Sequence, residues 1–159
     1  MAAVTLSTRE LRVEDAGEVL TLQRAAYVPE ARRYRDPELP PLTQTLDELR
    51  AELARPDVIG LGVRDDGRLV ASVRLRVDGP VAHLGRLVVA PDRQGQGLGT
   101  DLLAACERVL PPEVGELRLF TGSRSEETIR LYERVGYVRQ YETPEGTHAL
   151  VHLTKRFGA

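Results

Sequence analysis

Cysteine is almost absent from this chain, and so are long apolar runs and any large excess of charge of one sign. Cys106 is the single cysteine, so an internal disulfide is excluded and nothing indicates an oxidising compartment. No apolar run approaches the ~20 residues of a membrane-spanning helix, and residues 1–5 lack the pattern of a signal peptide. The formal net charge of −2 excludes a general basic field for nucleic acid. We therefore expect a cytoplasmic protein that binds neither membrane nor nucleic acid.

Lysine is also scarce, because Lys155 is the only lysine among 22 basic residues. A length of 159 residues favours one domain over residues 1–159, with room for a sizeable core. His148 and His152 share one strand face but lie too far apart to chelate a metal easily, and no third ligand is placed nearby. We predict no metal site.

Turn and capping signals divide the chain into seven strands and four helices of an α+β domain. The expected strands cover residues 5–13, 58–63, 69–77, 81–89, 117–121, 138–141 and 148–153. The expected helices begin at the cap signals Asp15, Thr45 and Ser123 and at a glycine-rich run. The first helix should end near Pro29, and an arginine- and proline-rich loop should follow over residues 29–44.

The glycine-rich run places Gly95, Gly97 and Gly99 between a strand and a helix over residues 98–110. Such a turn exposes backbone N–H groups, and the helix start adds partial positive charge, so the natural ligand is a phosphate or pyrophosphate. A P-loop requires a lysine that this run lacks. A dinucleotide fingerprint requires Gly-x-Gly-x-x-Gly in a parallel βαβ unit, whereas the strands before this run read as antiparallel hairpins.

The remaining pattern, Gln94-x-x-Gly97-x-Gly99, resembles the Gln/Arg-x-x-Gly-x-Gly/Ala signature of the GNAT acyl-CoA-dependent N-acyltransferases. Residues 87–92 resemble the strand and turn before that signature, and residues 125–137 resemble the second motif, Asn-x-x-Ala-x-x-x-Tyr-x-x-x-Gly-Phe. The resemblance covers most of the chain and is specific between residues 81 and 137. It implies the GNAT fold: a mostly antiparallel mixed sheet of about seven strands, flanked by about four helices and splayed between strands four and five.

The resemblance also implies how acetyl-CoA would be held as cosubstrate. The pyrophosphate would lie on the backbone amides of Gln94, Gly95, Gln96, Gly97, Leu98, Gly99 and Thr100. The pantetheine arm would bond to Leu87, Val88 and Val89 like an extra strand. A backbone N–H near Val88 would stabilise the oxyanion that develops on the thioester.

Two residues of the second motif receive implied roles. Tyr132 is the implied general acid, which protonates the leaving thiolate, a group with a pKa of about 8.5 by analogy to cysteine. Ser125 stands where the family usually has Asn, and Thr128 where it usually has Ala. Ser125 would either hydrogen-bond the pantetheine or cap the helix.

The general base must deprotonate an amine before it attacks. His83 occupies the strand position where many family members carry a glutamate, and histidine suits this task near neutral pH. A water relayed by the backbone or by Glu30, Glu38 or Tyr34 is an open alternative.

The acceptor should enter between the loop over residues 29–44 and the strands after Tyr137. The arginines Arg32, Arg33 and Arg35 form either a solvated face or a site for an acidic acceptor or the CoA phosphates. We therefore predict an acetyl-CoA-dependent N-acetyltransferase for a primary amine of a small molecule or peptide. The alternatives are another acyl-CoA donor, a non-catalytic acyl-CoA-binding sensor and, more remotely, a Rossmann-type oxidoreductase. The resemblance also implies that a homodimer could form through the late strands.

Overall fold

One mixed sheet of seven strands runs through the protein in the order β1-β2-β3-β4-β5-β7-β6. The computed structural model describes residues 6–158. Thr5, where we expected the first strand to begin, and the N-terminal segment 1–5, where we expected no signal peptide, lie outside the described residues. The strands are β1 (Leu6–Glu10), β2 (Val58–Asp65), β3 (Arg68–Asp78), β4 (Val81–Val89), β5 (Glu116–Gly122), β6 (Val138–Glu145) and β7 (His148–Arg156). This α+β architecture confirms the expected fold class.

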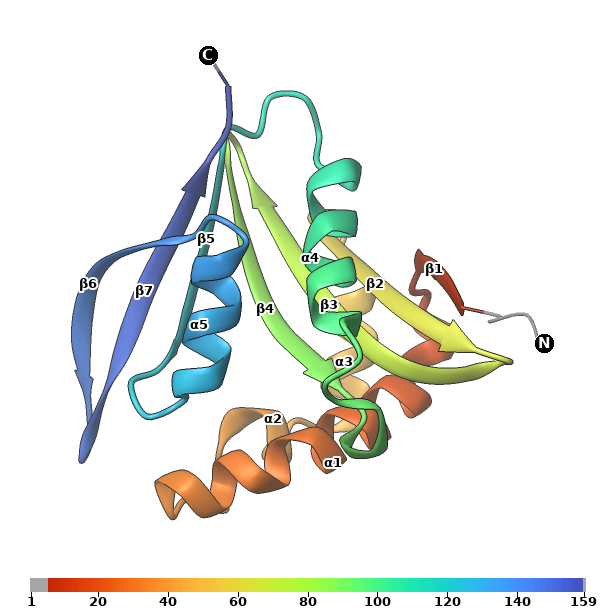
Figure 1. Cartoon of the computed structure of the whole chain (residues 1–159). Coiled ribbons are helices and arrows are strands. Elements are labelled where there is room, and N and C mark those ends of the chain that lie inside the picture. The colour runs from red at the N-terminus through yellow and green to blue at the C-terminus, as the bar shows by residue number, and fades with distance from the viewer. Residues whose placement is uncertain (1–5, 159) are drawn as a thin grey trace.

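Helices cover both faces of the sheet. They are α1 (Ala16–Tyr34), α2 (Pro40–Thr43), α3 (Leu46–Leu53), α4 (Leu98–Val109) and α5 (Glu126–Arg134), with single 3-10 turns η1 (Val13–Asp15) and η2 (Pro91–Arg93). Helices α4 and α5 pack on one face, while α1 and α3 pack on the other (Figure 1). Two apolar clusters result, one around Leu102 and Leu103 and one around Val19 and Leu49. Burial of these clusters drives the assembly of both layers.

The sheet splits between β4 and β5. These two strands are parallel and pair only at Val81, Ala82 and His83, opposite the start of β5. Beyond that point they diverge, and β5 continues with β7 as its partner (Figure 1). The expected splay between the fourth and fifth strands is therefore confirmed, and the later part of β4 has an open edge.

Helix α1 is longer than the sequence indicated. It passes through Pro29 and ends at Tyr34, so the loop predicted over residues 29–44 is wrong. Pro29 lies on the exposed side of the helix, as does Ala25, whose carbonyl loses its helical partner at this proline. The shorter segment that remains between α1 and α3 contains the single helical turn α2, which begins at Pro40. Figure 1 shows α1 running along the open end of the split sheet, from the β1 side to the α5 side.

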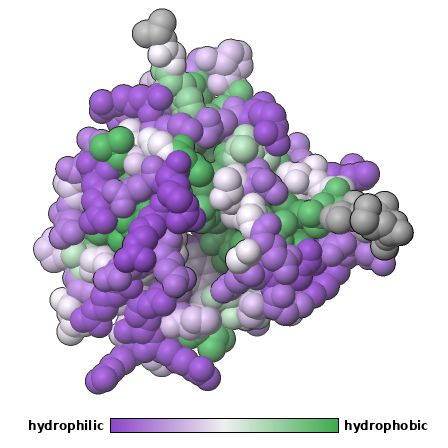
Figure 2. Space-filling model, viewed as in Figure 1, coloured by the Kyte–Doolittle hydropathy of each residue, from purple (hydrophilic) through white to green (hydrophobic). Residues whose placement is uncertain are grey.

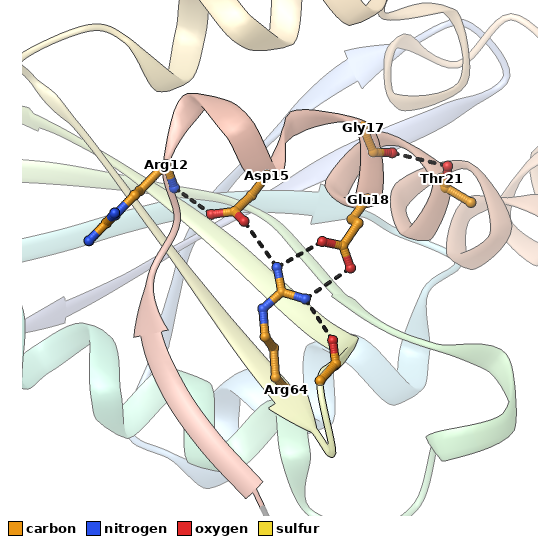
Figure 3. A network of polar contacts seen from close by, with 7 residues as sticks. Arg12, Asp15, Gly17, Glu18, Thr21 and Arg64 are labelled. Carbon is orange, nitrogen blue, oxygen red and sulfur yellow. Dashed lines mark hydrogen bonds and ion pairs between the residues drawn. The ribbon is translucent and has the colours of Figure 1, made fainter.

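The first turn of α1 is fixed to β2 by one arginine. Arg64 donates hydrogen bonds to Asp15 at 3.0 Å and to Glu18 at 2.9 Å (Figure 3). Asp15 also accepts the N–H of Arg12 at 2.7 Å. Asp15 occupies the N-cap position of α1, as expected, but its side chain bonds back to the η1 turn and makes no capping bond to α1.

A buried polar cluster joins α1, α2 and α3 to the sheet. Arg74 of β3 is only 4% exposed and pairs with Glu52 of α3. Arg74 also donates to Gln23 of α1 at 3.0 Å, and Gln23 donates to the carbonyl of Pro41 at 2.8 Å. Burial lowers the pKa of Arg74, and the attraction of Glu52 opposes this effect. The cluster sets the position of α1 over the sheet without an unpaired charge in the core.

Two other boundaries differ from the sequence prediction. The capping box expected at Ser123 is wrong, because α5 begins at Glu126 and the Ser123 hydroxyl accepts the N–H of Ala149 instead. The last hairpin is longer than expected, since β6 continues through Pro144 to Glu145. Pro144 is tolerated because β6 is an edge strand and does not need every N–H.

Candidate functional site

The glycine-rich turn lies at the open end of the split sheet, between β4 and α4. Gly95 and Gly97 adopt left-handed conformations, with φ of 77° and 82°. A Cβ at either position would meet no atom within 4 Å. Glycine is therefore required there by backbone conformation. Both residues are exposed, so the turn presents its backbone to solvent.

Backbone donors gather at this turn. The first helical hydrogen bond after it runs from the N–H of Asp101 to the carbonyl of Gly97, at 3.0 Å. The N–H groups of Leu98, Gly99 and Thr100 therefore precede the helical ladder, and the helix dipole adds partial positive charge beside them. These features fit an anionic group such as a pyrophosphate.

Gly99 serves packing. It is buried in the first turn of α4, and a Cβ there would approach the Leu131 side chain to 3.2 Å. Its lack of a side chain lets α4 and α5 lie close together. The alternate glycines thus have two separate uses, conformation at Gly95 and Gly97 and close helix contact at Gly99.

Two ion pairs hold the turn against the β2–β3 hairpin. Arg68 forms a bidentate pair with Asp92, both bonds at 2.7 Å, and this pair lowers the Asp92 pKa to about 2. Arg93 donates to Asp65 at 2.6 Å and to Gln96 at 2.8 Å. The turn is therefore fixed before any ligand arrives.

The end of β4 exposes backbone groups toward the split. Ala90 donates its N–H to Val70 of β3, and Val88 pairs with Ser72, so alternate residues of β4 face β3. Val89 lies between them, and the Gln94 side chain donates to its carbonyl at 3.3 Å. Since the N–H and C=O of one residue leave a strand on the same side, the N–H of Val89 faces the open edge. An extended ligand could bond there like an added strand.

Tyr132 of α5 is buried beside the same split. Its ring meets that of Tyr137 edge-on, with centroids 5.6 Å apart. Burial raises the Tyr132 pKa, and the nearby Tyr27, Tyr137 and Cys106 raise it further. The side chain is therefore a neutral phenol at neutral pH. Within residues 6–158 its hydroxyl has no hydrogen-bond partner, which leaves its proton for a ligand.

Ser125 makes contacts that the sequence did not suggest. It is 2% exposed, and its hydroxyl lies 2.7 Å from that of Tyr34 and 2.7 Å from a carboxylate oxygen of Glu30. Its side chain makes no capping bond to α5, so the capping alternative is wrong. A contact between Ser125 and CoA stays a prediction.

His83 lies away from this cluster, at the closed end of the split where β4 and β5 still pair. Burial lowers the pKa of His83, and Arg76 and Arg118 lower it further against the opposing effect of Asp78. Within residues 6–158, no hydrogen bond or ring contact joins His83 of β4 to Tyr132 of α5. The role of His83 as base stays a prediction.

Two residues of the site were not recognised as such from the sequence. Tyr27 of α1 neighbours Tyr132, and Arg86 of β4 faces Tyr27. Tyr34, which the sequence offered as a possible relay to the base, reaches Ser125. The signal for Arg86 was present, because it is the only charged residue in the apolar run 81–89. In the view of Figure 1, the surface is hollowed between the α4 and α5 halves, with hydrophobic residues in the recess (Figure 2).

Residues 6–158 hold no group of three His, Cys, Asp or Glu side chains arranged around a common metal position. No helix within the same range is both long and apolar enough to cross a membrane.

The split sheet, with the glycine-rich turn at its open end, defines a class of α+β proteins. Residues 19–137 match the model of the acetyltransferase (GNAT) family. This match covers most of the chain, and the protein belongs to that family. The family resemblance inferred from the two motifs is confirmed.

Similar proteins support this assignment. The chain is 33% identical over 105 residues to an S-(2-succino)cysteine N-acetyltransferase of Bacillus subtilis, a match covering 59% of this chain and 64% of that protein. It is 34% identical over 99 residues to a mycothiol acetyltransferase of Kineococcus radiotolerans, covering 60% of this chain but 32% of the relative. The matches thus span less than two thirds of either relative. The fold resembles that of a PaiA N-acetyltransferase from Thermoplasma acidophilum in complex with coenzyme A, at 20% identity, a TM-score of 0.78 and coverage of 96% and 99%.

Proposed function

We propose that the protein is an acetyl-CoA-dependent N-acetyltransferase that acetylates a primary amine by direct attack on the thioester. One observation carries the proposal: the open edge of β4 at Val89 leads directly to the N–H groups of the glycine-rich turn. A ligand with an extended arm and a pyrophosphate matches both features in order.

Bound acetyl-CoA would supply an acyl thioester. The turn from Gln94 to Thr100 would bind the pyrophosphate, and Leu87, Val88 and Val89 would align the pantetheine arm. In this segment a backbone N–H would stabilise the negative charge that develops on the thioester oxygen. Of these groups, the N–H of Val89 has the clearest orientation toward the open edge.

The amine nitrogen would form a bond to the carbonyl carbon while the bond from that carbon to sulfur breaks. Tyr132 would give its hydroxyl proton to the departing sulfur, and the proton lost by the amine would pass to the base. The products are an N-acetyl amine and CoA with a free thiol. The Tyr132 side chain is buried, and its hydroxyl has no hydrogen-bond partner among residues 6–158, which supports the acid role.

The function is tested by following free CoA thiol while acetyl-CoA is incubated with a panel of amines. We expect release with at least one amine and an increase in the mass of that amine by one acetyl group. Other acyl-CoA donors tested with the same amine would reveal the acyl preference. Tight binding of acetyl-CoA with no release from any amine would instead identify a non-catalytic sensor.

The acid role is tested by Tyr132→Phe. We expect kcat to fall about 100-fold or more, in the range of general acid catalysis, with the acetyl-CoA KM within twofold. Tyr137→Phe is the matched control. The Tyr137 hydroxyl likewise has no hydrogen-bond partner among the described residues, and it receives no role in the proposed reaction. Equal kcat in Tyr132→Phe and wild type would remove Tyr132 from the mechanism.

A further inference from the structure

Arg86 occupies an unusual backbone position in the middle of β4. Its φ is 55°, in the left-handed region that residues other than glycine rarely adopt. The β3–β4 register shifts here, because Ser72 pairs with Val88 while Arg74 pairs with Gly85. Arg86 therefore stands in a β-bulge, a feature that redirects a side chain.

The redirected side chain faces α1. The guanidinium of Arg86 acts on the hydroxyl of Tyr27, lowering its pKa against the larger raising effect of burial. It also lies near Arg74, whose charge Glu52 neutralises. Arg86 thus projects onto the α1 and α3 face, opposite the layer formed by α4 and α5.

The side chain of Arg86 hydrogen-bonds the hydroxyl of Tyr27, but its positive charge has no carboxylate partner among residues 6–158. Its Nε is buried and forms no hydrogen bond, and no carboxylate of residues 6–158 lies within 4.0 Å of its guanidinium. Every other arginine in that range without a carboxylate partner is exposed to solvent. The less exposed Arg64 and Arg74 each pair with a carboxylate. Figure 3 shows the pairs of Arg64 with Asp15 and Glu18. Burying a guanidinium without a charged partner costs free energy, and a bound anion would offset that cost.

Glu30, the acid closest to this position on α1, is already engaged. It pairs with Arg33 and accepts the hydroxyl of Ser125. The buried Nε of Arg86 therefore remains a donor for a group from outside the chain.

Tyr27 connects Arg86 to the proposed reaction centre, because it is a neighbour of both Arg86 and Tyr132. An anion held by Arg86 would thus lie near Tyr27, which in turn neighbours the proposed acid. The edge of a guanidinium that carries Nε–H and one Nη–H matches the two oxygens of a carboxylate. The glycine-rich turn already provides a separate place for the phosphates of CoA.

We propose that Arg86 binds a carboxylate of the acceptor, so that the protein acetylates amines that carry a carboxylate near the amino group, as amino acids do. This inference rests on the proposed function and specifies its acceptor class. It makes Arg86 a specificity-determining residue.

The proposal is tested with matched amine pairs that differ in the carboxylate alone, each α-amino acid being compared with its amide. An amide is a demanding control, because its amino group is less basic and is more often neutral at pH 7. We expect kcat/KM to be about 100-fold higher for the amino acid with wild type, because removing one partner of a buried charge pair has an effect of that size or larger.

Two variants locate the preference. Arg86→Gly suits a φ of 55° and should fold, while Arg86→Gln keeps a polar side chain. Both should lose the preference through a higher acceptor KM, with the acetyl-CoA KM within twofold. Arg76→Gln is the matched control, since Arg76 lies on the adjacent strand, exposed to solvent, and this variant should keep the preference.

The outcomes separate the two proposals. Efficient acetylation of amides or simple amines by wild type, or an unchanged preference in Arg86→Gly, would overturn the role of Arg86 while leaving the N-acetyltransferase intact. A chain that releases no CoA with any amine would refute the proposed function, and this inference with it.

Discussion

The hydroxyl of Tyr34 lies 2.7 Å from Oγ of Ser125, so the last residue of α1 is tied to the start of α5 across the open end of the split sheet. The direction of the bonds follows from the carboxylate of Glu30, which only accepts. Ser125 therefore donates to Glu30, Tyr34 donates to Ser125, and the N–H of Arg124 donates to Tyr34 at 3.0 Å. This chain of bonds fixes the far end of α1, as Arg64 fixes its first turn.

Gly122 should be essential for this contact. A Cβ at Gly122 would overlap the hydroxyl and ring of Tyr34. We expect Gly122→Ala to displace Tyr34, to lower the free energy of unfolding by about 1–3 kcal/mol, as overpacking does, and to raise the acceptor KM. Gly17→Ala is the control, because a Cβ at Gly17 meets nothing within 4 Å.

Denaturant unfolding of the two variants and of the double variant Gly122→Ala with Tyr34→Ala measures this relationship. The double variant should lose less stability than the sum of the single changes, since the smaller side chain removes the overlap. Additive losses would mean that Gly122 and Tyr34 do not compete for the same space.

Ser125→Ala should weaken the attachment of α1. The change leaves the hydroxyl proton of Tyr34 without its acceptor, and the expected loss is about 1–3 kcal/mol in the free energy of unfolding. Ser72→Ala is a matched control, because Ser72 is equally buried but its hydroxyl has no partner among the described residues. Its removal should cost little.

Kinetics separate the two roles considered for Ser125. Because its hydroxyl is engaged by Tyr34 and Glu30, we expect the acceptor KM to rise in Ser125→Ala while the acetyl-CoA KM stays within twofold. A selective rise in the acetyl-CoA KM would show instead that Ser125 binds the pantetheine arm.

The sequence predicted those parts of the fold that depend on local pattern. Turn signals placed β2, β3 and β4, and the cap signal at Thr45 placed α3. It did not predict that α1 continues past Pro29. That extension depends on Tyr34 packing against Gly122 and Ser125, which are distant in the chain.

The candidate site divides in the same way. The glycine-rich turn is visible in the sequence, because left-handed conformations at Gly95 and Gly97 demand glycine. The direction of the Arg86 side chain was not predictable, since it follows from a shift in the β3–β4 register. Such a bulge depends on pairing between strands and leaves no distinct mark in a single sequence.

Gly97→Leu should raise the acetyl-CoA KM about tenfold or more. The backbone of the turn would force leucine into a left-handed conformation at φ 82°. The new side chain would also cover the N–H groups at the start of α4. The cost of that conformation alone is about 1–2 kcal/mol. Gly67→Leu supplies the control, because Gly67 has φ 86° and open space around it but lies in the β2–β3 turn.

Both variants should lose similar stability in thermal unfolding, and only Gly97→Leu should change the acetyl-CoA KM. Equal acetyl-CoA KM values in Gly97→Leu and wild type would separate the turn from CoA binding.

His83 can be tested by the pH dependence of the rate. A base must be neutral to accept a proton, and burial lowers the pKa of His83 from its usual 6.5. If His83 is the base, kcat should therefore fall as pH decreases through a value below 6.5, when the imidazole becomes protonated. His83→Gln should lower kcat, abolish this acidic limb and leave the acetyl-CoA KM unchanged.

His152→Gln is the control for the His83 experiment, because His152 stacks on Tyr141, with centroids 4.3 Å apart, on another strand. An acidic limb that survives in His83→Gln would exclude His83 as the base. Glu30 would then be the next candidate, since its carboxylate lies beside Tyr27 and contacts Ser125 at the open end of the sheet.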